Sequence, residues 1–449
     1  MKGYRSMKLQ SLSHHAASSI ALLALALSAF VLPAHAELDI AEVTSERDVT
    51  AWLVEDPTDP MVVISFAFLG GTSQDPEGKE GMTDLMTSLL NEGAGDLDSS
   101  AFQQRFYETG ADLSFRSSRE LVAGTIRMLA DETEEPLELL KLALTEPRFD
   151  EAPFTREQSV AISRVRAEAN DPDDQGQRAL MAALYGDHPL GRQATVESLQ
   201  EITRDDLASL HEKTFARSDL FIGAVGNIDQ ERLATILDEV FGDLPAEADP
   251  ADVPPPDINF GKKVVQTYDR PQSSIQMVYP AVGAKDAEIY TASLIAEMLG
   301  GSGLVSRLFE ALREERGLTY SAGAYLDSAP EWGDLTVNFS TRGDQTEQAI
   351  DAAQQVIEEF ATDGPSQEEL DGAKQYSIGS YAISQLSSTS AIARTLVGLQ
   401  RLGRGRDYLE RRVELFDAVT VEDVQDLARQ MFSVEPTTLI VGPVEDGDQ

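Results

Sequence analysis

Four polar residues repeat at helical spacing within EGMTDLMTSLLNEGAG, residues 80–95, and such a row of side chains can bind a metal or move a proton. Asp84, Thr87, Ser88 and Asn91 lie at i, i+3, i+4 and i+7, which places them on one face of a helix. Apolar residues repeat with the same period on another face: Met82, Leu85, Met86, Leu89 and Leu90. Two glycines then predict the end of the helix. The polar face is therefore a functional site, an ordinary solvated surface, or a former site whose functional residues have been replaced.

A second candidate lies in SRLFEALREERGLTYSAG, residues 306–323. The pattern predicts that Arg313 ends an amphipathic helix, that Gly317 breaks it, and that Tyr320 begins a strand. A guanidinium and a phenol presented together can stabilise a carbonyl or an oxyanion. The alternative is an ordinary charged helix end followed by a half-buried tyrosine.

The composition of the chain excludes several other kinds of catalytic and metal site. The chain has no cysteine, which excludes disulfides, thiolate zinc sites and cysteine nucleophiles. Beyond residue 36 it has two histidines, so a two-histidine metal site must use His188 and His211. The sequence places His188 in a His-Pro turn and His211 on an exposed amphipathic helix, which argues against that pair. A calcium site formed by Asp84 and Glu92 is disfavoured as well.

The first residues predict export. A basic start is followed by the short apolar run IALLALALSAF (20–30) and the small-residue site AHA (34–36). We expect residues 1–36 to be a secretory signal peptide, cut after Ala36, and the protein to be periplasmic. No later run approaches ~20 apolar residues, so membrane insertion is not expected.

The charge of the chain disfavours nucleic acid as a partner. Removal of the signal peptide leaves 33 Lys and Arg against 77 Asp and Glu, a net charge of about −44. Such acidity repels nucleic acid and anionic membranes, and it either solvates the surface or attracts basic peptides.

The sequence pattern indicates two similar domains that arose by duplication. The acidic, proline-rich stretch PAEADPADVPPPD (245–257) predicts a linker between domains 37–244 and 258–449. Each half opens with an apolar strand (61–71 and 273–283), continues with two helices, returns to alternating strands, and closes with another apolar strand after further helices. This order predicts an α+β fold, in which each domain has a mostly antiparallel sheet packed with helices. The strand at 61–69 is a candidate for pairing with an extended peptide at a sheet edge.

LGGSGLVSRLFEALREERGLTYS (299–321) resembles the C-terminal-half signature of the M16 (insulinase/pitrilysin-like) metallopeptidases, in their short two-domain, dimeric subfamily. GDHPLGR (186–192) and ESLQEITRDDLASLHEKTFARSDLFIGAVGNID (197–229) are similar to the closing part of the first domain in that family. The resemblance runs in order through the whole chain after the signal peptide, and it includes the duplication.

The resemblance implies where a zinc site belongs. In this family a helix of the first domain carries His-x-x-Glu-His, and a further glutamate lies downstream. The matching positions here are Asp84, Thr87, Ser88 and Arg164, and none has the residue type of the family. We therefore expect no metal or other cofactor in this chain, and we expect Arg164 to pair with Asp84.

Arg313 and Tyr320 match the pair that, by the same resemblance, reaches from the second domain towards the scissile bond. In paired M16 proteases one subunit carries the zinc motif and its partner keeps this Arg/Tyr pair. The resemblance thus implies a subunit that is inactive alone, that acts on peptides, and that forms a heterodimer with a zinc-bearing M16 subunit. One alternative is a non-enzymatic scaffold or peptide-binding homodimer. Another, a hydrolase with an unfamiliar site, is disfavoured by the missing cysteines, the scarce histidines and the lack of G-x-S-x-G.

Overall fold

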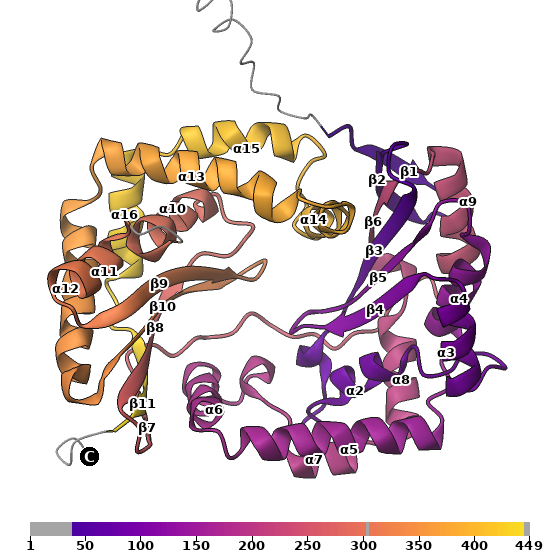
Figure 1. Ribbon diagram of the computed structural model, residues 1–449, viewed down its shortest axis with the longest axis horizontal. Helices are drawn as coiled ribbons and strands as arrows, with labels where there is room; N and C mark the ends of the chain where they lie inside the picture. The colour runs from indigo at the N-terminus through magenta and orange to yellow at the C-terminus, as the bar shows by residue number, and fades with distance from the viewer. Residues whose placement is uncertain (1–37, 302–304, 444–449) are drawn as a thin grey trace, which may run out of the picture. The chain divides into compact units, whose positions relative to one another are not determined.

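A computed structural model describes residues 38–301 and 305–443 (Figure 1). The chain divides into two units, Met1–Leu38 and Asp39–Gln449, and the second contains all the helices and strands described below. The predicted signal peptide, 1–36, lies outside the described residues, as do three residues of the 299–321 motif. Within the described ranges no helix is long and apolar enough to cross a membrane.

The first sheet has six strands in the order β1-β2-β6-β3-β5-β4. Neighbouring strands are antiparallel except for the parallel pair β2 and β6. The strands are β1 (Ala41–Thr44), β2 (Thr50–Glu55), β3 (Met61–Leu69), β4 (Asp112–Ser117), β5 (Leu121–Leu129) and β6 (Leu220–Gly226).

The second sheet repeats this arrangement in the order β7-β11-β8-β10-β9, again with one parallel pair, β7 and β11. Its strands are β7 (Lys263–Thr267), β8 (Gln272–Ala281), β9 (Thr319–Ser328), β10 (Gly333–Arg342) and β11 (Thr437–Gly442). The order β2-β6-β3-β5-β4 of the first sheet matches it strand for strand. The predicted α+β fold with duplicated, mostly antiparallel sheets is confirmed.

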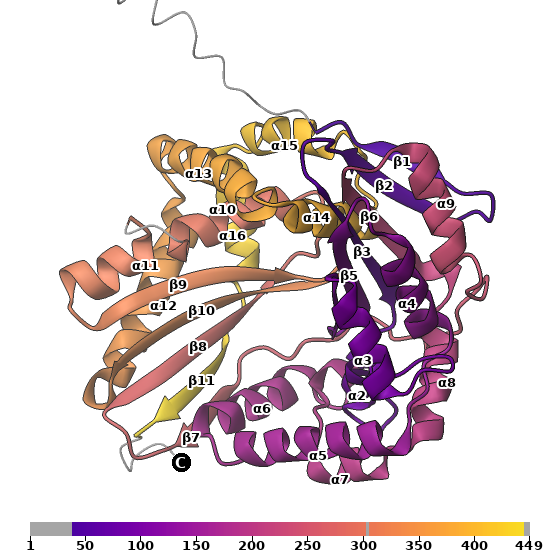
Figure 2. The ribbon, with the colours of Figure 1, turned by 45° about the vertical axis from the view of Figure 1, so that its right-hand side comes forward.

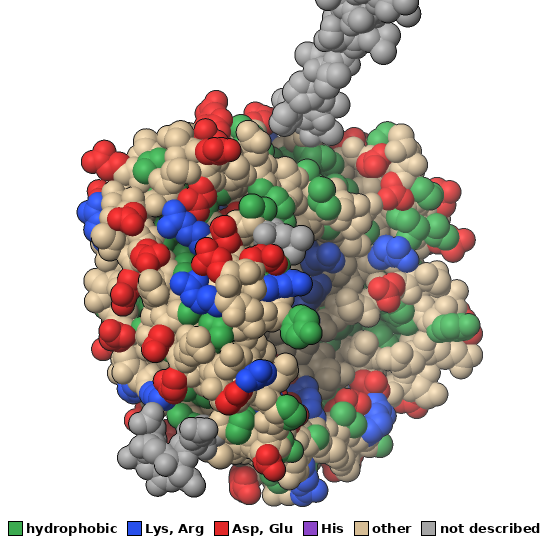
Figure 3. All heavy atoms as spheres, turned by 60° about the vertical axis from the view of Figure 1, so that its left-hand side comes forward, with side chains coloured by type: hydrophobic (Ala, Val, Ile, Leu, Met, Phe, Trp, Pro, Cys, Tyr) green, Lys and Arg blue, Asp and Glu red, His purple; other side chains and the backbone are tan. Residues whose placement is uncertain are grey.

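Helices connect and cover the strands. The first half contains α2 (Met82–Leu89), α3 (Ser99–Glu108), α4 (Glu134–Thr145), α5 (Glu151–Glu168), α6 (Pro172–Tyr185), α7 (Val196–Glu201), α8 (Arg204–Thr214) and α9 (Gln230–Phe241). The second contains α10 (Ile289–Gly300), α11 (Arg307–Phe309), which continues as a π-helical segment Glu310–Glu315, then α12 (Thr346–Asp363), α13 (Gln367–Gln385), α14 (Thr389–Arg401), α15 (Tyr408–Asp417) and α16 (Val421–Met431). Acidic side chains are spread over the face shown in Figure 3, as the net charge of −41 leads one to expect.

Two sequence predictions about strands were incomplete or wrong. The strand predicted to open each half is preceded by others, β1 and β2 in the first half and β7 in the second. The strand at 61–69 is not available for edge pairing, because β3 lies between β6 and β5 in the sheet. Edge positions in the described sheets belong to β1, β4, β7 and β9.

Each sheet is covered on one face by a helix from the other half of the sequence. Helix α14 packs on β6 and β3, and α6 packs on β11 and β7 (Figures 1 and 2). This explains why the interiors of β3 and β11 are mostly apolar without alternation and almost completely buried.

Two glycines allow these helices to approach the strands. A Cβ added to Gly223 of β6 would lie 2.3 Å from the carbonyl oxygen of Ala393 in α14. A Cβ added to Gly176 of α6 would lie 2.6 Å from a methyl group of Val441 in β11.

Replacement of Gly223 by alanine is therefore expected to lower stability by about 1–3 kcal/mol, because the backbone of α14 has to move away from β6. Gly379→Ala is the matched control, since this glycine lies inside α13 with nothing within 4 Å of the added Cβ. The control is expected to gain ~0.5–1 kcal/mol from the better helix propensity of alanine. Thermal unfolding measures both. Equal melting temperatures for the two variants would show that the close packing of α14 is not required.

The proline-rich stretch 245–257 contains no helix or strand and is hydrogen-bonded to the first half. The amides of Arg217 and Ser218 donate to the carbonyls of Pro245 and Ala246 at 2.9 and 3.1 Å. The side chain of Gln74 both donates to and accepts from the backbone of residue 251. The boundaries 37–244 and 258–449 remain predictions.

Candidate functional site

The helix predicted in residues 80–95 is α2, and its apolar face is buried as the spacing indicated. Each residue of the apolar stripe is less than 5% exposed: Met82, Leu85, Met86, Leu89 and Leu90. The helix begins over Asp75, whose carboxylate accepts from the amides of Gly81 and Thr83 at 2.8 and 2.9 Å and from the Thr83 hydroxyl at 2.6 Å. Burial raises the pKa of Asp75 to about 6 despite these donors. The helix ends at Leu89, earlier than the glycines suggested.

The hydroxyls on the polar face of α2 are bonded to their own helix. Thr87 Oγ1 donates to the carbonyl of Thr83 at 2.7 Å, and Ser88 Oγ donates to the carbonyl of Leu85 at 2.8 Å. Side chains that bond back in this way are common inside helices and offer no donor to a ligand. Asp84 Oδ1 instead accepts from the hydroxyl of Ser117 at the end of β4.

Arg164 on α5 lies beside Asp84, as predicted. Its Nη2 is 3.9 Å from Asp84 Oδ2, and its Nε is 3.6 Å from Glu168 Oε1 one turn further along α5. Both Asp84 and Arg164 are about half exposed, so this pair contributes at most about 1 kcal/mol to stability.

A cavity of about 380 Å³ opens beside these two residues. Its charged lining consists of four arginines and four acidic residues: Arg119, Arg164, Arg178, Arg192, Asp75, Glu80, Asp84 and Glu168. Sequence analysis found Asp84 and Arg164 but missed the other arginines, which come from the β4–β5 turn, from α6 and from the turn after residue 189. Arg192 does belong to the GDHPLGR motif, so that motif was the signal that could have found it.

The four matched positions do not fit a zinc ion. One carboxylate, two hydroxyls bonded to helix carbonyls, and a guanidinium replace the nitrogen and carboxylate ligands that zinc needs. Throughout the described residues, no group of three or more His, Asp or Glu side chains is arranged to hold a metal ion.

Both remaining histidines are engaged elsewhere. His211 was predicted to lie on an exposed helix face, and this is wrong: it is 9% exposed and stacks on Phe215 with ring centroids 4.4 Å apart. Its Nε2 donates to the carbonyl of Leu144 at 2.9 Å. His188 accepts from the amide of Leu190 through Nδ1. Sequence periodicity missed the burial of His211 because Leu144 and Phe149, which contact its ring, come from a separate segment of the chain.

Burial lowers the pKa of His211 to about 4 from 6.5. The unfolded chain therefore takes up a proton between pH 6.5 and pH 4 that the folded chain does not, and His211 lowers stability by up to ~3 kcal/mol as the pH falls through this range. His211→Gln keeps an N–H donor for Leu144 and removes the titration. The stability of the wild type relative to this variant is expected to fall by about that amount between pH 7 and pH 4. Urea unfolding at several pH values checks this, and parallel pH profiles would contradict it.

Arg313 and Tyr320 both reach solvent in the second half. The Arg313 side chain is 41% exposed, its guanidinium lies 4.9 Å from the ring centroid of Phe309, and its Nε is 3.7 Å from a Glu314 carboxylate oxygen. Gly317, with φ of +62°, ends the helical segment, and β9 begins at residue 319. Tyr320 is 82% exposed and lies at the start of this edge strand. Neither side chain lines the 380 Å³ cavity beside α2.

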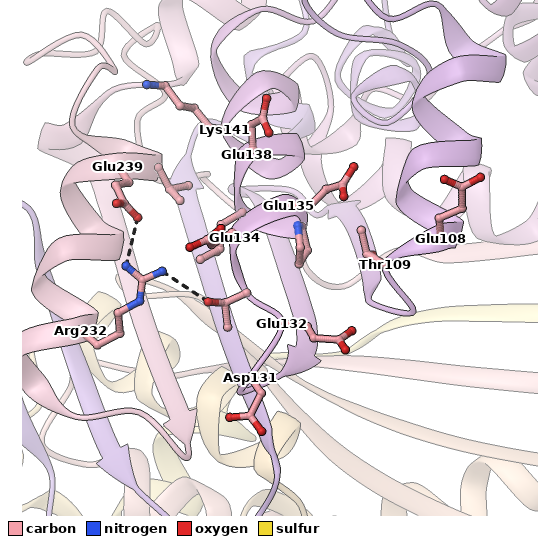
Figure 4. A pocket seen from close by; sticks show the side chains of 14 residues that line it. Glu108, Thr109, Asp131, Glu132, Glu134, Glu135, Glu138, Lys141, Arg232 and Glu239 are labelled. Atoms are coloured by element: carbon pink, nitrogen blue, oxygen red, sulfur yellow. Dashed lines mark hydrogen bonds and ion pairs between the residues drawn. The ribbon is translucent and has the colours of Figure 1, made fainter.

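A further cavity, of about 790 Å³, lies over α4 and is strongly acidic (Figure 4). Its carboxylates are those of Glu108, Asp131, Glu132, Glu134, Glu135, Glu138 and Glu239. Arg232 bonds to Glu239 and to the Thr133 hydroxyl, both at 3.4 Å. In Figure 4 the labelled carboxylates point in different directions, so they do not converge on one ligand atom.

Comparison with known sequences decides the family. Residues 50–196 match the model described as insulinase (peptidase family M16), and residues 201–376 match the model described as peptidase M16 inactive domain. The chain belongs to the peptidase M16 family. Among its relatives, the uncharacterized zinc protease YmxG of Bacillus subtilis is 24% identical over 90% of this chain and 98% of its own length. An uncharacterized zinc protease of Rickettsia felis is 22% identical over 85% of this chain and 92% of its own.

Solved structures agree with this assignment. The peptidase M16 inactive domain from Pseudomonas fluorescens has a TM-score of 0.84 and 25% identity over 92% of this chain and all of its own. The periplasmic protease PqqL from Escherichia coli has a TM-score of 0.78 at 15% identity, over 90% of this chain and 45% of that longer one, and shares the fold. The M16 fold is thus present, while Asp84, Thr87, Ser88 and Arg164, which the resemblance matched to three zinc ligands and a general base, have other residue types.

Proposed function

We propose that this chain is the zinc-free subunit of a heterodimeric, periplasmic M16 metallopeptidase whose other subunit carries His-x-x-Glu-His and zinc. The proposal rests on the residues that form the two faces of α2. The helix keeps the buried apolar face of an M16 helix, whereas its polar face holds hydroxyls bonded to helix carbonyls and an Asp84–Arg164 pair. Arg164 lies next to Asp84, which supports the match of Arg164 to the downstream glutamate.

In this proposal Arg313 and Tyr320 act in the partner's site on a bound peptide. The guanidinium orients the carbonyl of the scissile bond, and the phenol donates a hydrogen bond to the oxygen that becomes negative in the tetrahedral intermediate. Their exposure supports the role, because among the described residues Arg313 has only a 3.7 Å contact with Glu314 and a ring contact with Phe309, and no hydrogen bond holds the Tyr320 hydroxyl.

The periplasmic setting rests on the predicted signal peptide, residues 1–36. The structurally similar protein of Escherichia coli is described as a periplasmic protease, which is consistent with that setting.

An activity assay tests this function. The purified chain is incubated with an unstructured peptide alone and then with an M16 chain from the same organism that carries His-x-x-Glu-His. We expect no cleavage by this chain, and an activity of the mixture well above that of the zinc-bearing chain alone. An unchanged rate on mixing, together with a self-associated form of this chain, would favour the scaffold or peptide-binding homodimer instead.

A further inference from the structure

A cavity of about 390 Å³ in the second half is lined by arginines, aromatic rings and uncharged side chains, and by no carboxylate of the described residues, although the chain as a whole is strongly acidic. It lies among α10, α13, α14 and α15 and the loop between the last two. Its polar lining includes three arginines and three tyrosines: Arg394, Arg404, Arg412, Tyr290, Tyr381 and Tyr408. The volume is within the range of small-molecule sites, about 300–1,000 Å³.

Arg412 is a buried cation in this lining without an anionic partner. It is 8% exposed, and its guanidinium lies over two rings, 4.1 Å from the centroid of Tyr381 and 4.6 Å from that of Phe416. Its Nη2 donates to the carbonyl of Ser377 at 2.7 Å. Within residues 38–301 and 305–443, none of the three arginines of the cavity forms an ion pair with a carboxylate.

The pKa of Arg412 reflects its burial. Burial lowers it, whereas the hydrogen bond to Asp173 raises the pKa of Arg270. A buried charge normally has a partner, because removing an ion from water costs several kcal/mol. Arg412 has no carboxylate partner among the described residues, and this indicates that the cavity binds an anion from outside them.

Two further donors face the same space. Arg404 lies over the rings of Tyr290 and Tyr408, at 5.7 and 5.6 Å, and donates to the carbonyl of Ala284 at 2.6 Å. Tyr290 is 7% exposed, and its hydroxyl has no hydrogen-bond partner among the described residues. Tyr408 is near enough to help burial raise the pKa of Tyr290, but the two hydroxyls do not reach hydrogen-bond geometry. A buried donor left unpaired costs about 1–3 kcal/mol, which a bound acceptor would recover.

We propose that this cavity binds the oxyanion of a small ligand, a carboxylate or a phosphate carried on an apolar or aromatic body. Nη2 of Arg412 already donates to Ser377, so the remaining N–H groups of its guanidinium are the ones that would donate to an oxygen of a carboxylate or phosphate. Arg404 and the Tyr290 hydroxyl supply the remaining donors, and the aromatic walls contact the body of the ligand. The site is separate from α2 and from the Arg313–Tyr320 pair, so it does not depend on the proposed peptidase role.

Calorimetric titration of the full chain with benzoate, phenyl phosphate and neutral benzamide tests the proposal. At least one of the anions is expected to bind with a dissociation constant of about 1 mM or lower, and benzamide at least about tenfold more weakly. Tighter binding of benzoate identifies a carboxylate ligand, and tighter binding of phenyl phosphate identifies a phosphate. No heat from either anion at about 10 mM would overturn the proposal.

Variants of residues that line the cavity then test whether the anion binds there. Tyr290→Phe and Arg404→Gln are each expected to weaken binding by about tenfold or more, since each removes a donor to a charged group. Tyr290→Phe should fold normally, because the lost hydroxyl makes no bond in the structure. Arg411→Gln is the control: Arg411 is on the same helix as Arg412, pairs with Asp407 at 3.4 Å, and does not line the cavity. Equal affinities in the wild type and both cavity variants would overturn the assignment.

Discussion

Arg313→Ala is expected to lower kcat/KM of the assembled peptidase by roughly 10²–10³-fold, which is the usual loss when one donor to a developing oxyanion is removed. Tyr320→Phe is expected to have a similar effect, because it removes a hydroxyl and leaves the ring. Neither change should affect folding. Arg313 is 41% exposed with a loose contact to Glu314, and Tyr320 is 82% exposed.

Kinetics and gel filtration together check this prediction. If the pair acts on the intermediate, kcat falls and the heterodimer still elutes intact; if the pair only binds the peptide, KM rises and kcat is unchanged. Arg316→Ala is the matched control, since Arg316 follows the same helical segment and pairs with Glu315 at 2.9 Å. Wild-type turnover by both variants would remove Arg313 and Tyr320 from the mechanism.

The second large effect is a gain of metal binding when the family's ligands are restored. The variant Asp84→His, Thr87→Glu, Ser88→His and Arg164→Glu is expected to bind about one zinc ion per chain, whereas the wild type retains none after dialysis. The backbone of α2 already presents positions 84, 87 and 88 at i, i+3 and i+4, and Arg164 lies 3.9 Å from Asp84. Metal analysis and the melting temperature with and without a chelator measure the effect without any assay of activity.

The matched control keeps Arg164 and changes the three residues on α2. Its zinc affinity is expected to be roughly 100-fold lower or worse, because one ligand is missing and a guanidinium stands in its place. Thr87 is only 5% exposed, so circular dichroism must show that the glutamate is tolerated. A folded four-residue variant that binds no zinc would contradict the match of Asp84, Ser88 and Arg164 to the M16 zinc ligands.

The sequence predicted those parts of the fold that depend on local pattern. The apolar runs at 61–71 and 273–283 form β3 and β8, and the duplication shows in the matching strand orders of the two sheets. It could not predict that α14 covers β6, or that β3 is central, because neither is written in the periodicity of a single element. The close approach of α14 depends on Gly223 meeting Ala393, 170 positions later in the chain.

The candidate site also has some features that the sequence could predict and others that it could not. The positions on α2 and the Arg313–Tyr320 pair follow from motif spacing, and the Asp84–Arg164 contact follows from the register of the family. The other arginines beside Asp84 come from separate segments, so no spacing rule connects them. The cavity around Arg412 combines residues from 284 to 416. Only the three-dimensional structure shows that no carboxylate of the described residues lines it.

Isolation of the tagged chain from its native periplasm, with identification of any co-eluting protein and a count of zinc, tests the central claim most directly. The heterodimer proposal predicts a stoichiometric M16 partner that carries His-x-x-Glu-His, with about one zinc ion per pair. A zinc-free assembly that contains this chain alone would contradict it.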